Sequence, residues 1–202
     1  YIFFMKPSER EDMKYSQGHT TKVAQEENEM FNLLPKTGGK LLDIGCGEGS
    51  ISVKLREAGF DVTGIDFSPV AIDMAKAKVL NAQVVDVDGC LPFADKEFSV
   101  AWFGDILEHV FDPILLMKEI CRVLKDDGVA LLTTPNEMWL PARINALFGR
   151  SPQSSVYRKF GQCKHHTMMS LELLEYFIKT AGLKMVYFES ICLIPKTKIE
   201  FV

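Results

Sequence analysis

Three glycines near residue 45 stand where a protein backbone can hold a ligand. Gly45, Gly47 and Gly49 alternate with other residues directly after the apolar and acidic run at 41–44. Because glycine has no Cβ, such a turn exposes its peptide groups to a bound molecule. The spacing is G-x-G-x-G and differs from the G-x-G-x-x-G of dinucleotide-binding proteins. A tight turn without a ligand is the alternative, because a short glycine motif is a weak signal.

Two later acids could extend this turn into a nucleoside site. Asp66 ends an apolar run, and an acid at the carboxyl end of a strand can accept hydrogen bonds from both hydroxyls of a ribose. Ser68 is better placed than Asp66 to cap the following helix, which favours a ligand role for Asp66. Asp86 and the amide of Val87 could bind the amino edge of an adenine, whereas a lone Asp86 is equally an ordinary turn residue.

Alternating strands and helices must position these residues. Ser68 and Asp112 are each followed by proline, as at helix starts, and Gly59 and Gly128 are placed to end helices before the next strand. Such alternation predicts an α/β, doubly wound, mainly parallel sheet with helices on both faces. The predicted strands are 40–44, 61–66, 83–87, 98–103 and 128–134, and the predicted helices are 49–58, 69–80 and 112–125.

The two ends of the chain depart from this alternation. Residues 1–36 are expected to form a polar lead-in and a helix at 22–34, and residues 135–169 form a long excursion. A helix capped by Ser170 is expected to reach about Ala181, with Gly182 ending it and strands following at 183–190 and 191–202. The 202 residues are expected to form a single domain.

Composition excludes several classes of partner. The net charge of −4 argues against nucleic acid, which needs a basic surface. Five cysteines without a CxxC pair argue against a disulfide framework, so we expect a reducing, cytoplasmic location and assign no metal ligands. No apolar run approaches the ~20 residues of a membrane-spanning helix.

Four motifs together resemble the class I S-adenosylmethionine-dependent methyltransferases. They occur in the family's order over about residues 37–190, at 43–49, 64–66, 86–93 and 107–110. The closer likeness is to the small-molecule group that includes ubiquinone-pathway O-methyltransferases, because Pro135-Asn136, His165 and Ser170 follow its pattern. The resemblance implies a Rossmann-like fold of about seven strands, the last antiparallel, with 135–169 as an acceptor-binding lid insertion.

The resemblance also implies which residues hold S-adenosylmethionine, with S-adenosylhomocysteine as product. On the methionine side, Asp43 and the carbonyl of Gly104 would lie near the ammonium. The glycine turn would lie along the methionine chain, and β-strand ends would hold the nucleoside. The implied contacts are Gly45, Cys46 and Gly47 to the methionine, Asp66 to the ribose, Phe67 stacked beside the adenine, and Asp86 with Val87 to the adenine amino edge.

The excursion has the composition of a site for the methyl acceptor. No acid occurs from Met138 to Leu171, whereas five basic residues and two histidines do: Arg143, Arg150, Arg158, Lys159, Lys164, His165 and His166. This stretch would attract an anionic acceptor, and a solvated basic loop is the alternative. The apolar residues among 139–148 recur at helical spacing, which favours a lid helix over peripheral membrane contact through 138–150.

Methyl transfer to an oxygen or nitrogen would need a base when the acceptor is a phenol or an amine. His165 is the first candidate and His166 the second, and a structural role for His165 in holding the lid is the alternative. Glu108 and His109 are adjacent, and neighbours on a helix point about 100° apart, which argues against a paired role.

We therefore predict a methyltransferase acting on a small, anionic or amphipathic molecule, with no oligomeric state assigned. The alternative is a non-catalytic S-adenosylmethionine-binding module that acts through protein partners. A nicotinamide-dependent oxidoreductase is disfavoured by the glycine spacing.

Overall fold

The computed structural model describes residues 30–78, 80–135, 140–151, 165–186 and 188. These residues belong to two compact units, which we describe in turn. The first unit contains the described residues up to Gly104 together with Arg122–Thr133, and the second contains Asp105–Cys121 with the described residues from Thr134 onward. Most of the helix expected at 22–34 lies outside the described residues, and residues 30–32 are helical.

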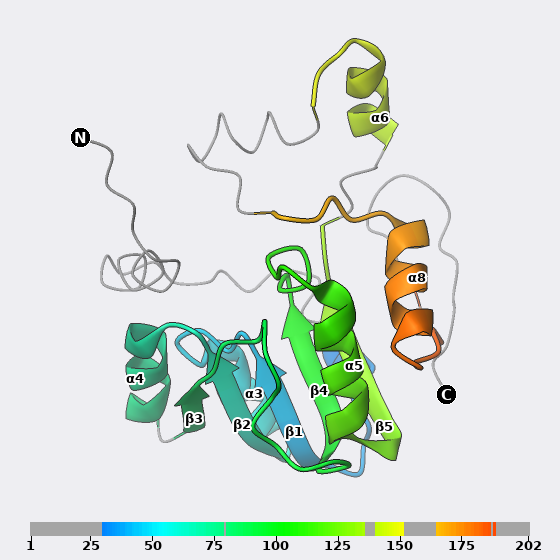
Figure 1. The fold of residues 1–202 in the computed structure, drawn as a ribbon. Helices are drawn as coiled ribbons and strands as arrows, with labels where there is room; N and C mark the ends of the chain where they lie inside the picture. Colours follow the sequence, from blue (N-terminus) through cyan, green and yellow to red (C-terminus); the bar gives the residue numbers. More distant parts are fainter. Residues whose placement is uncertain (1–29, 79, 136–139, 152–164, 187, 189–202) are drawn as a thin grey trace, which may run out of the picture. The chain divides into compact units, whose positions relative to one another are not determined.

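A parallel five-stranded sheet forms the first unit (Figure 1). Its order is β3-β2-β1-β4-β5, and every neighbouring pair is parallel, as the alternation predicted. The strands are β1 (Gly39–Ile44), β2 (Phe60–Asp66), β3 (Asn81–Val84), β4 (Phe98–Gly104) and β5 (Leu124–Thr133).

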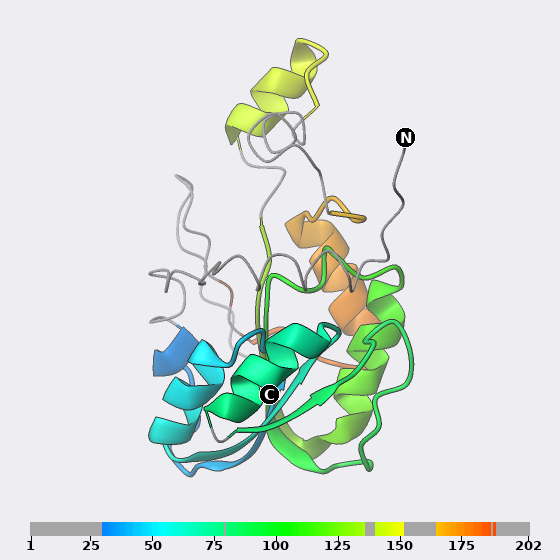
Figure 2. The same ribbon diagram turned by 90° about the vertical axis from the view of Figure 1, so that its left-hand side faces the viewer.

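Two helices connect the first three strands, α3 (Ser50–Glu57) and α4 (Pro69–Ala77). Right-handed crossovers from β1 to β2 to β3 carry both helices to one face of the sheet. Val53 of α3 packs against a cluster that includes Ile72 and Ala75 of α4, so the two helices lie side by side (Figure 2). The Ser68 hydroxyl accepts from the amide of Ala71 at 3.1 Å, so it caps α4 as predicted.

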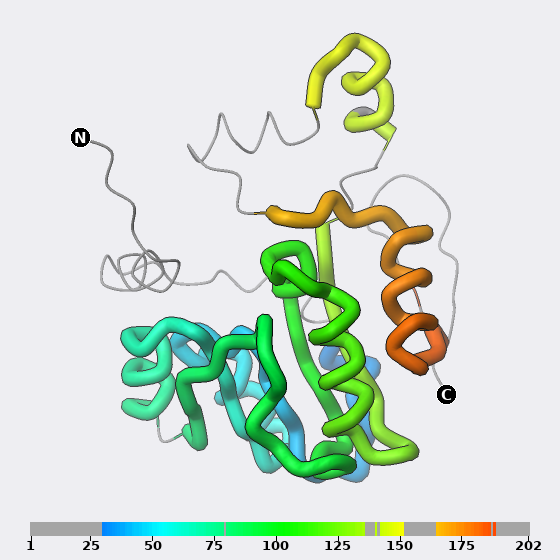
Figure 3. Tube along the Cα trace, viewed as in Figure 1, coloured from blue at the N-terminus to red at the C-terminus, as the bar shows by residue number. Residues whose placement is uncertain are grey.

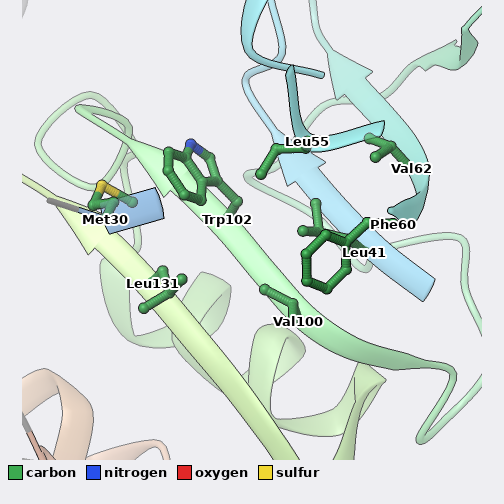
Figure 4. Packing of buried hydrophobic residues seen from close by; sticks show 8 residues of the cluster. All are labelled: Met30, Leu41, Leu55, Phe60, Val62, Val100, Trp102 and Leu131. Atoms are coloured by element: carbon green, nitrogen blue, oxygen red, sulfur yellow. The ribbon is translucent and has the colours of Figure 1, made fainter. Parts of the chain in front are cut away.

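The core of the first unit lies on the same face as α3. Leu41 of β1 pairs with Val62 of β2 and Val100 of β4, and all three side chains are buried. Trp102 stacks at a tilt against Phe31, with ring centroids 5.1 Å apart. Figure 4 shows eight members of the cluster, which are Met30, Leu41, Leu55, Phe60, Val62, Val100, Trp102 and Leu131. Burying each such side chain contributes roughly 1.5–3 kcal/mol, so the core holds β1 rigidly in the middle of the sheet.

Strand β5 begins earlier than the sequence predicted. Helix α5 (Pro113–Val123) passes directly into β5 at Leu124, whereas a helix to 125 and a strand from 128 were expected. Phe98 pairs with Leu124 and Val100 with Val129, so the extra residues of β5 form a bulge. A Cβ at Gly128 would lie 2.9 Å from the carbonyl oxygen of Lys125, so this glycine serves the bulge rather than a helix end.

The second unit contains most of α5 together with α6 (Leu140–Leu147) and α8 (Leu171–Thr180). The Ser170 hydroxyl accepts from the amide of Leu173 at 3.2 Å, and Gly182 has φ +86°, so both predicted ends of α8 are confirmed. Figure 3 traces the turn at 105–112 that leads from β4 into α5. No strand is assigned at 183–186 or at 188, and the other residues of the expected sixth and seventh strands lie outside the described residues.

Helix α6 confirms that the apolar spacing among residues 139–148 marks a helix. Its apolar side chains at Leu140, Ile144 and Leu147 are exposed, and so is Phe148 just beyond its end. Trp139, Arg158, Lys159 and Lys164 lie outside the described residues. Among the described segments, no helix is both long and apolar enough to cross a membrane.

Candidate functional site

The carboxyl ends of the parallel strands meet at one edge of the sheet in the first unit. The strand order reverses between β1 and β4, and ligands of open α/β sheets bind outside the strand ends at such a point. The glycine turn at 45–49 follows β1, and Gly104 ends β4. The two segments that flank this switch point are therefore both ones that the sequence singled out.

The glycine turn adopts a backbone that other residues rarely accept. Its φ angles are +75° at Gly45, +56° at Gly47 and +81° at Gly49. The amides of Gly45 and Cys46 donate to the carbonyl oxygen of Ile65 at 2.7 and 3.0 Å. These bonds tie the turn to the end of β2 and hold it in one conformation.

Asp66 joins the glycine turn to α4. Its side chain is buried, with Oδ2 accepting from the amide of Gly47 and Oδ1 accepting from the amide of Ser68, both at 2.9 Å. A carboxylate offers about four acceptor positions, and these two amide bonds fix its orientation. The group is suited to bind a pair of hydroxyls, and Ser68 is the helix cap, as the sequence indicated.

Asp43 lies within β1, and its side chain is only 2% exposed. Its Oδ2 accepts from the hydroxyl of Ser52 at 2.5 Å. Burial raises the pKa of Asp43 from 3.8 to about 7; the Ser52 hydrogen bond lowers this pKa, and the charge of Asp66 raises it. A buried carboxyl of this kind is stabilised in its charged form by a nearby cation, which fits the ammonium of an amino-acid ligand.

The Cys46 side chain packs directly against Gly64 of β2. A Cβ at Gly64 would lie 2.8 Å from the Cys46 sulfur, so β2 and the turn approach closely only because residue 64 is glycine. Burial raises the pKa of the Cys46 thiol, and the charges of Asp43 and Asp66 raise it further. The thiol therefore acts as a packing group at neutral pH rather than as a nucleophile.

The remaining predicted contacts follow β2 and β3, which pair at Asp66 and Val84. Phe67 is 37% exposed, and Asp86 is exposed just beyond β3. The Asp86 carboxylate accepts from the amide of Asp88 at 3.0 Å, which is the turn contact that the sequence offered as its alternative role. Val87 follows at the same edge and is half-buried. All the predicted cofactor residues therefore belong to the first unit.

Sequence reasoning assigned no role to two polar groups of this site. Ser52, in the first turn of α3, orients the Asp43 carboxyl with its hydroxyl. The only sign of this contact in the sequence is that the two residues lie nine positions apart across a strand, a turn and a helix start. Glu48 is buried and forms an ion pair with Lys78, next to the hydroxyl of Ser50. This pair joins the glycine turn to the end of α4.

A second cluster of polar groups lies in the second unit. Glu108 and His109 belong to a turn rather than to a helix, so the helical argument against their pairing does not apply. Glu108 is 1% exposed, its Oε2 accepts from the hydroxyl of Thr134 at 3.1 Å, and its Oε1 lies 3.9 Å from His109 Nε2. Burial raises the pKa of Glu108 to about 7, and the charge of Asp105 raises it further.

His165 and His166 have different aromatic neighbours on this turn. The amides of His166 and Thr167 donate to the carbonyl oxygen of Glu108 at 2.7 and 3.3 Å. The half-buried ring of His165 meets that of His109 edge-on at 5.0 Å, whereas the exposed His166 ring lies 4.4 Å from that of Phe111. The structure thus brings His165 to Glu108 and His109 and places His166 against an aromatic ring.

Comparisons with known proteins agree with this architecture. A family profile described as a methyltransferase domain matches residues 17–187. The demethylmenaquinone methyltransferase of Staphylococcus aureus (strain JH9) is 34% identical over 113 residues, which are 52% of this chain and 47% of that protein. The chain spans less than half the length of the curated relatives that it matches.

Solved structures show the same fold. An S-adenosylmethionine-dependent methyltransferase from Mesorhizobium loti has a TM-score of 0.69 and 24% identity, covering 84% of this chain and 85% of its own. Phosphoethanolamine N-methyltransferase 2 of Haemonchus contortus, in complex with S-adenosyl-L-methionine, has a TM-score of 0.64 and 25% identity. The match covers 79% of this chain and 36% of that protein. The chain therefore belongs to the methyltransferase domain family, and its fold is that of the class I S-adenosylmethionine-dependent methyltransferases.

Proposed function

We propose that this chain transfers a methyl group from S-adenosylmethionine to an oxygen or nitrogen of a small-molecule acceptor. The observation that carries the proposal is the pair of buried acids, Asp43 and Asp66, at the switch point of the sheet. One suits an ammonium and the other a ribose diol, and the glycine turn lies between them in the chain. A pyrophosphate at this position would be repelled by the Asp66 carboxylate, and by Asp43 whenever that carboxyl is ionised.

The residues present fit this cofactor. Asp43 and the carbonyl of Gly104 hold the ammonium, and Asp66 binds the ribose. The turn and the two strand ends bind the rest of the molecule through Gly45, Cys46, Gly47, Phe67, Asp86 and Val87. When bound, the cofactor supplies a methyl group activated by its sulfonium. The protein's part is to align the acceptor with that methyl group and to exclude water.

The acceptor side is assigned to the second unit. The stretch from Met138 to Leu171 carries positive charge without acids, and α6 exposes an apolar face at Leu140, Ile144 and Leu147. Both features suit an anionic or amphipathic small molecule, and the staphylococcal relative is named for a small molecule, demethylmenaquinone. His165 is the first candidate for the base that accepts the acceptor's proton, and His166 is the second.

Calorimetry on matched variants tests the cofactor assignment. Asp66→Asn should weaken S-adenosylmethionine binding at least tenfold, because the amide replaces one hydroxyl acceptor with a donor. Asp61→Asn, at the exposed start of the same strand, should leave the affinity unchanged. Binding of NAD in place of S-adenosylmethionine would refute the proposal.

Turnover is tested with labelled cofactor and a metabolite extract. The proposal requires a labelled product that depends on the extract. Tight cofactor binding with no labelled product in any extract would favour the non-catalytic binding module instead.

A further inference from the structure

The glycine turn itself contains a buried carboxylate, close in the chain to the acids of the cofactor site. Glu48 stands between Gly47 and Gly49, and its side chain is only 6% exposed. A carboxylate taken out of water needs a positive charge or several hydrogen bonds to compensate it. Asp43 and Asp66 of the same unit are buried as well, so a further buried acid here is stable only with a cation of its own.

Both oxygens of this carboxylate are bonded. Oε1 accepts from the hydroxyl of Ser50 at 2.5 Å, and Oε2 accepts from the ammonium of Lys78 in the ion pair. Lys78 also donates to the Ser50 hydroxyl at 3.3 Å, so the three groups close a ring of hydrogen bonds. Ser50 begins α3 and Lys78 is the C-cap of α4, so this ring ties the glycine turn to both helices.

Packing and a main-chain bond hold the end of α4 against the turn. The guanidinium of Arg56 in α3 donates to the carbonyl oxygen of Lys78 at 3.3 Å, which fastens the two helices together there. A Cβ at Gly49 would lie 2.5 Å from Cδ1 of Leu80 and 3.1 Å from the Cβ of Ala75, so the turn lies directly on this end of the helix. The ion pair therefore acts across a tightly packed contact.

The glycine turn is thus restrained at two places. The amides of residues 45–47 donate to the end of β2 and to the Asp66 carboxylate. The pair of Glu48 and Lys78 adds a restraint from the other side, at the end of α4. Glycine loses more conformational freedom on folding than any other residue, so a turn with three glycines gains most from such restraints.

We propose that Glu48 and Lys78 are positioning residues for the amino-acid chain of S-adenosylmethionine, because their ion pair holds the peptide groups of the glycine turn in the conformation that binds this chain. The inference rests on the proposed function, in which residues 45–47 contact the methionine. The nucleoside contacts depend less on the pair, since Asp66 keeps its hydrogen bond from the amide of Ser68. Loss of the pair should therefore weaken binding of the amino-acid chain and spare the nucleoside.

Calorimetry with two ligands tests this role in the full chain. S-adenosylhomocysteine carries the nucleoside and the amino-acid chain, whereas 5′-methylthioadenosine carries the nucleoside without that chain. Lys78→Met leaves a buried carboxylate without its cation, so it should weaken S-adenosylhomocysteine binding at least about tenfold and 5′-methylthioadenosine binding less than about twofold. Lys78→Arg keeps the cation and should bind S-adenosylhomocysteine within about threefold of the unmodified protein. Lys76→Met, at an exposed position of the same helix, is the matched control and should leave both affinities unchanged.

A double variant tests the pair rather than either residue alone. Glu48→Gln removes the buried charge and keeps an oxygen that accepts from Ser50. Combined with Lys78→Met, it should bind S-adenosylhomocysteine more tightly than Lys78→Met alone, because no unpaired charge remains in the turn. Circular dichroism checks folding. If Lys78→Met does not fold, the double variant gives the same comparison of the two ligands.

The outcomes separate this inference from the proposed function. Equal losses for both ligands in Lys78→Met, or no loss for either, would overturn the positioning role and leave the cofactor assignment standing. A double variant weaker than Lys78→Met would also overturn it. Failure of the unmodified protein to bind either ligand would overturn the proposed function itself, and the inference with it.

Discussion

Replacing Asp43 by asparagine is expected to stabilise the cofactor-free protein above pH 7 while weakening the binding of S-adenosylmethionine. The carboxyl is buried, and its pKa rises from 3.8 to about 7 in the folded protein. Asparagine keeps an oxygen that accepts from Ser52, so the hydrogen bond at 2.5 Å survives the change. The variant therefore removes the charge with little other disturbance.

The sign follows from proton binding. Between pH 3.8 and about 7 the unfolded chain has lost the Asp43 proton and the folded chain retains it, so stability falls as the pH rises. Each pKa unit corresponds to about 1.4 kcal/mol, which gives an upper limit of about 4 kcal/mol for the whole interval. The loss is complete above about pH 7 and absent below pH 3.8. The amide of the Asp43→Asn variant does not titrate, so that variant escapes this loss.

Urea unfolding at pH 5 and pH 8 measures the difference. The free energy of unfolding of Asp43→Asn, relative to the unmodified protein, should rise by about 2–3 kcal/mol between these two pH values. A relative stability that does not change with pH would refute the buried, proton-retaining carboxyl. Ser52→Ala provides a second check, because loss of its hydrogen bond should extend the pH-dependent fall to higher pH.

Cofactor affinity should change in the opposite direction. Binding of the ammonium requires the ionised carboxylate, so the affinity of the unmodified protein should fall up to tenfold per pH unit below pH 7. Calorimetry at pH 6 and pH 8 should show this fall in the unmodified protein and a weak, nearly constant affinity in Asp43→Asn. An unchanged affinity at pH 8 would remove Asp43 from the cofactor site.

Three further changes have defined outcomes. Gly64→Ala should lower the free energy of unfolding by about 1–3 kcal/mol and weaken cofactor binding, because the new Cβ would lie 2.8 Å from the Cys46 sulfur. Gly89→Ala is the control: its Cβ would have its nearest neighbouring atom at 3.8 Å, so thermal unfolding should not change. Ser68→Ala should lower the free energy of unfolding in urea by about 1 kcal/mol through loss of the α4 cap, and an unchanged value would contradict the cap. Arg122→Ala should speed hydrogen exchange in the loop before β4, whose carbonyls its guanidinium binds at 2.8 and 2.9 Å; unchanged exchange would show that the loop holds itself.

The central sheet could be predicted because local signals agree with tertiary structure there. Ser68 and Gly59 mark helix ends at positions where the strand pairing also requires the chain to turn. The boundaries of β3 and β5 could not be predicted, since pairing with neighbouring strands decides where a strand begins. The residues before Gly128 include two acids and a lysine, which resemble a helix end, and only the register against Phe98 and Val100 shows a bulge.

The cofactor residues could be predicted from the sequence more fully than the cluster around Glu108. The cofactor residues follow successive strands, and parallel strands bring their carboxyl ends together, so order along the chain predicts proximity. The Glu108 cluster depends on a turn and on hydrogen bonds from a distant loop to one carbonyl oxygen. No periodicity marks such contacts, which is why His165 could be named as a candidate without its neighbours.

The close approach of β2 to the glycine turn has an evolutionary consequence. Residues 46 and 64 share a volume that accommodates one side chain, since a Cβ at 64 would lie 2.8 Å from the sulfur and 3.1 Å from the Cβ of Cys46. A side chain at position 64 therefore becomes tolerable only when position 46 gives up its own. Among natural variants of this chain the two positions should covary, with a larger residue at one accompanied by glycine at the other.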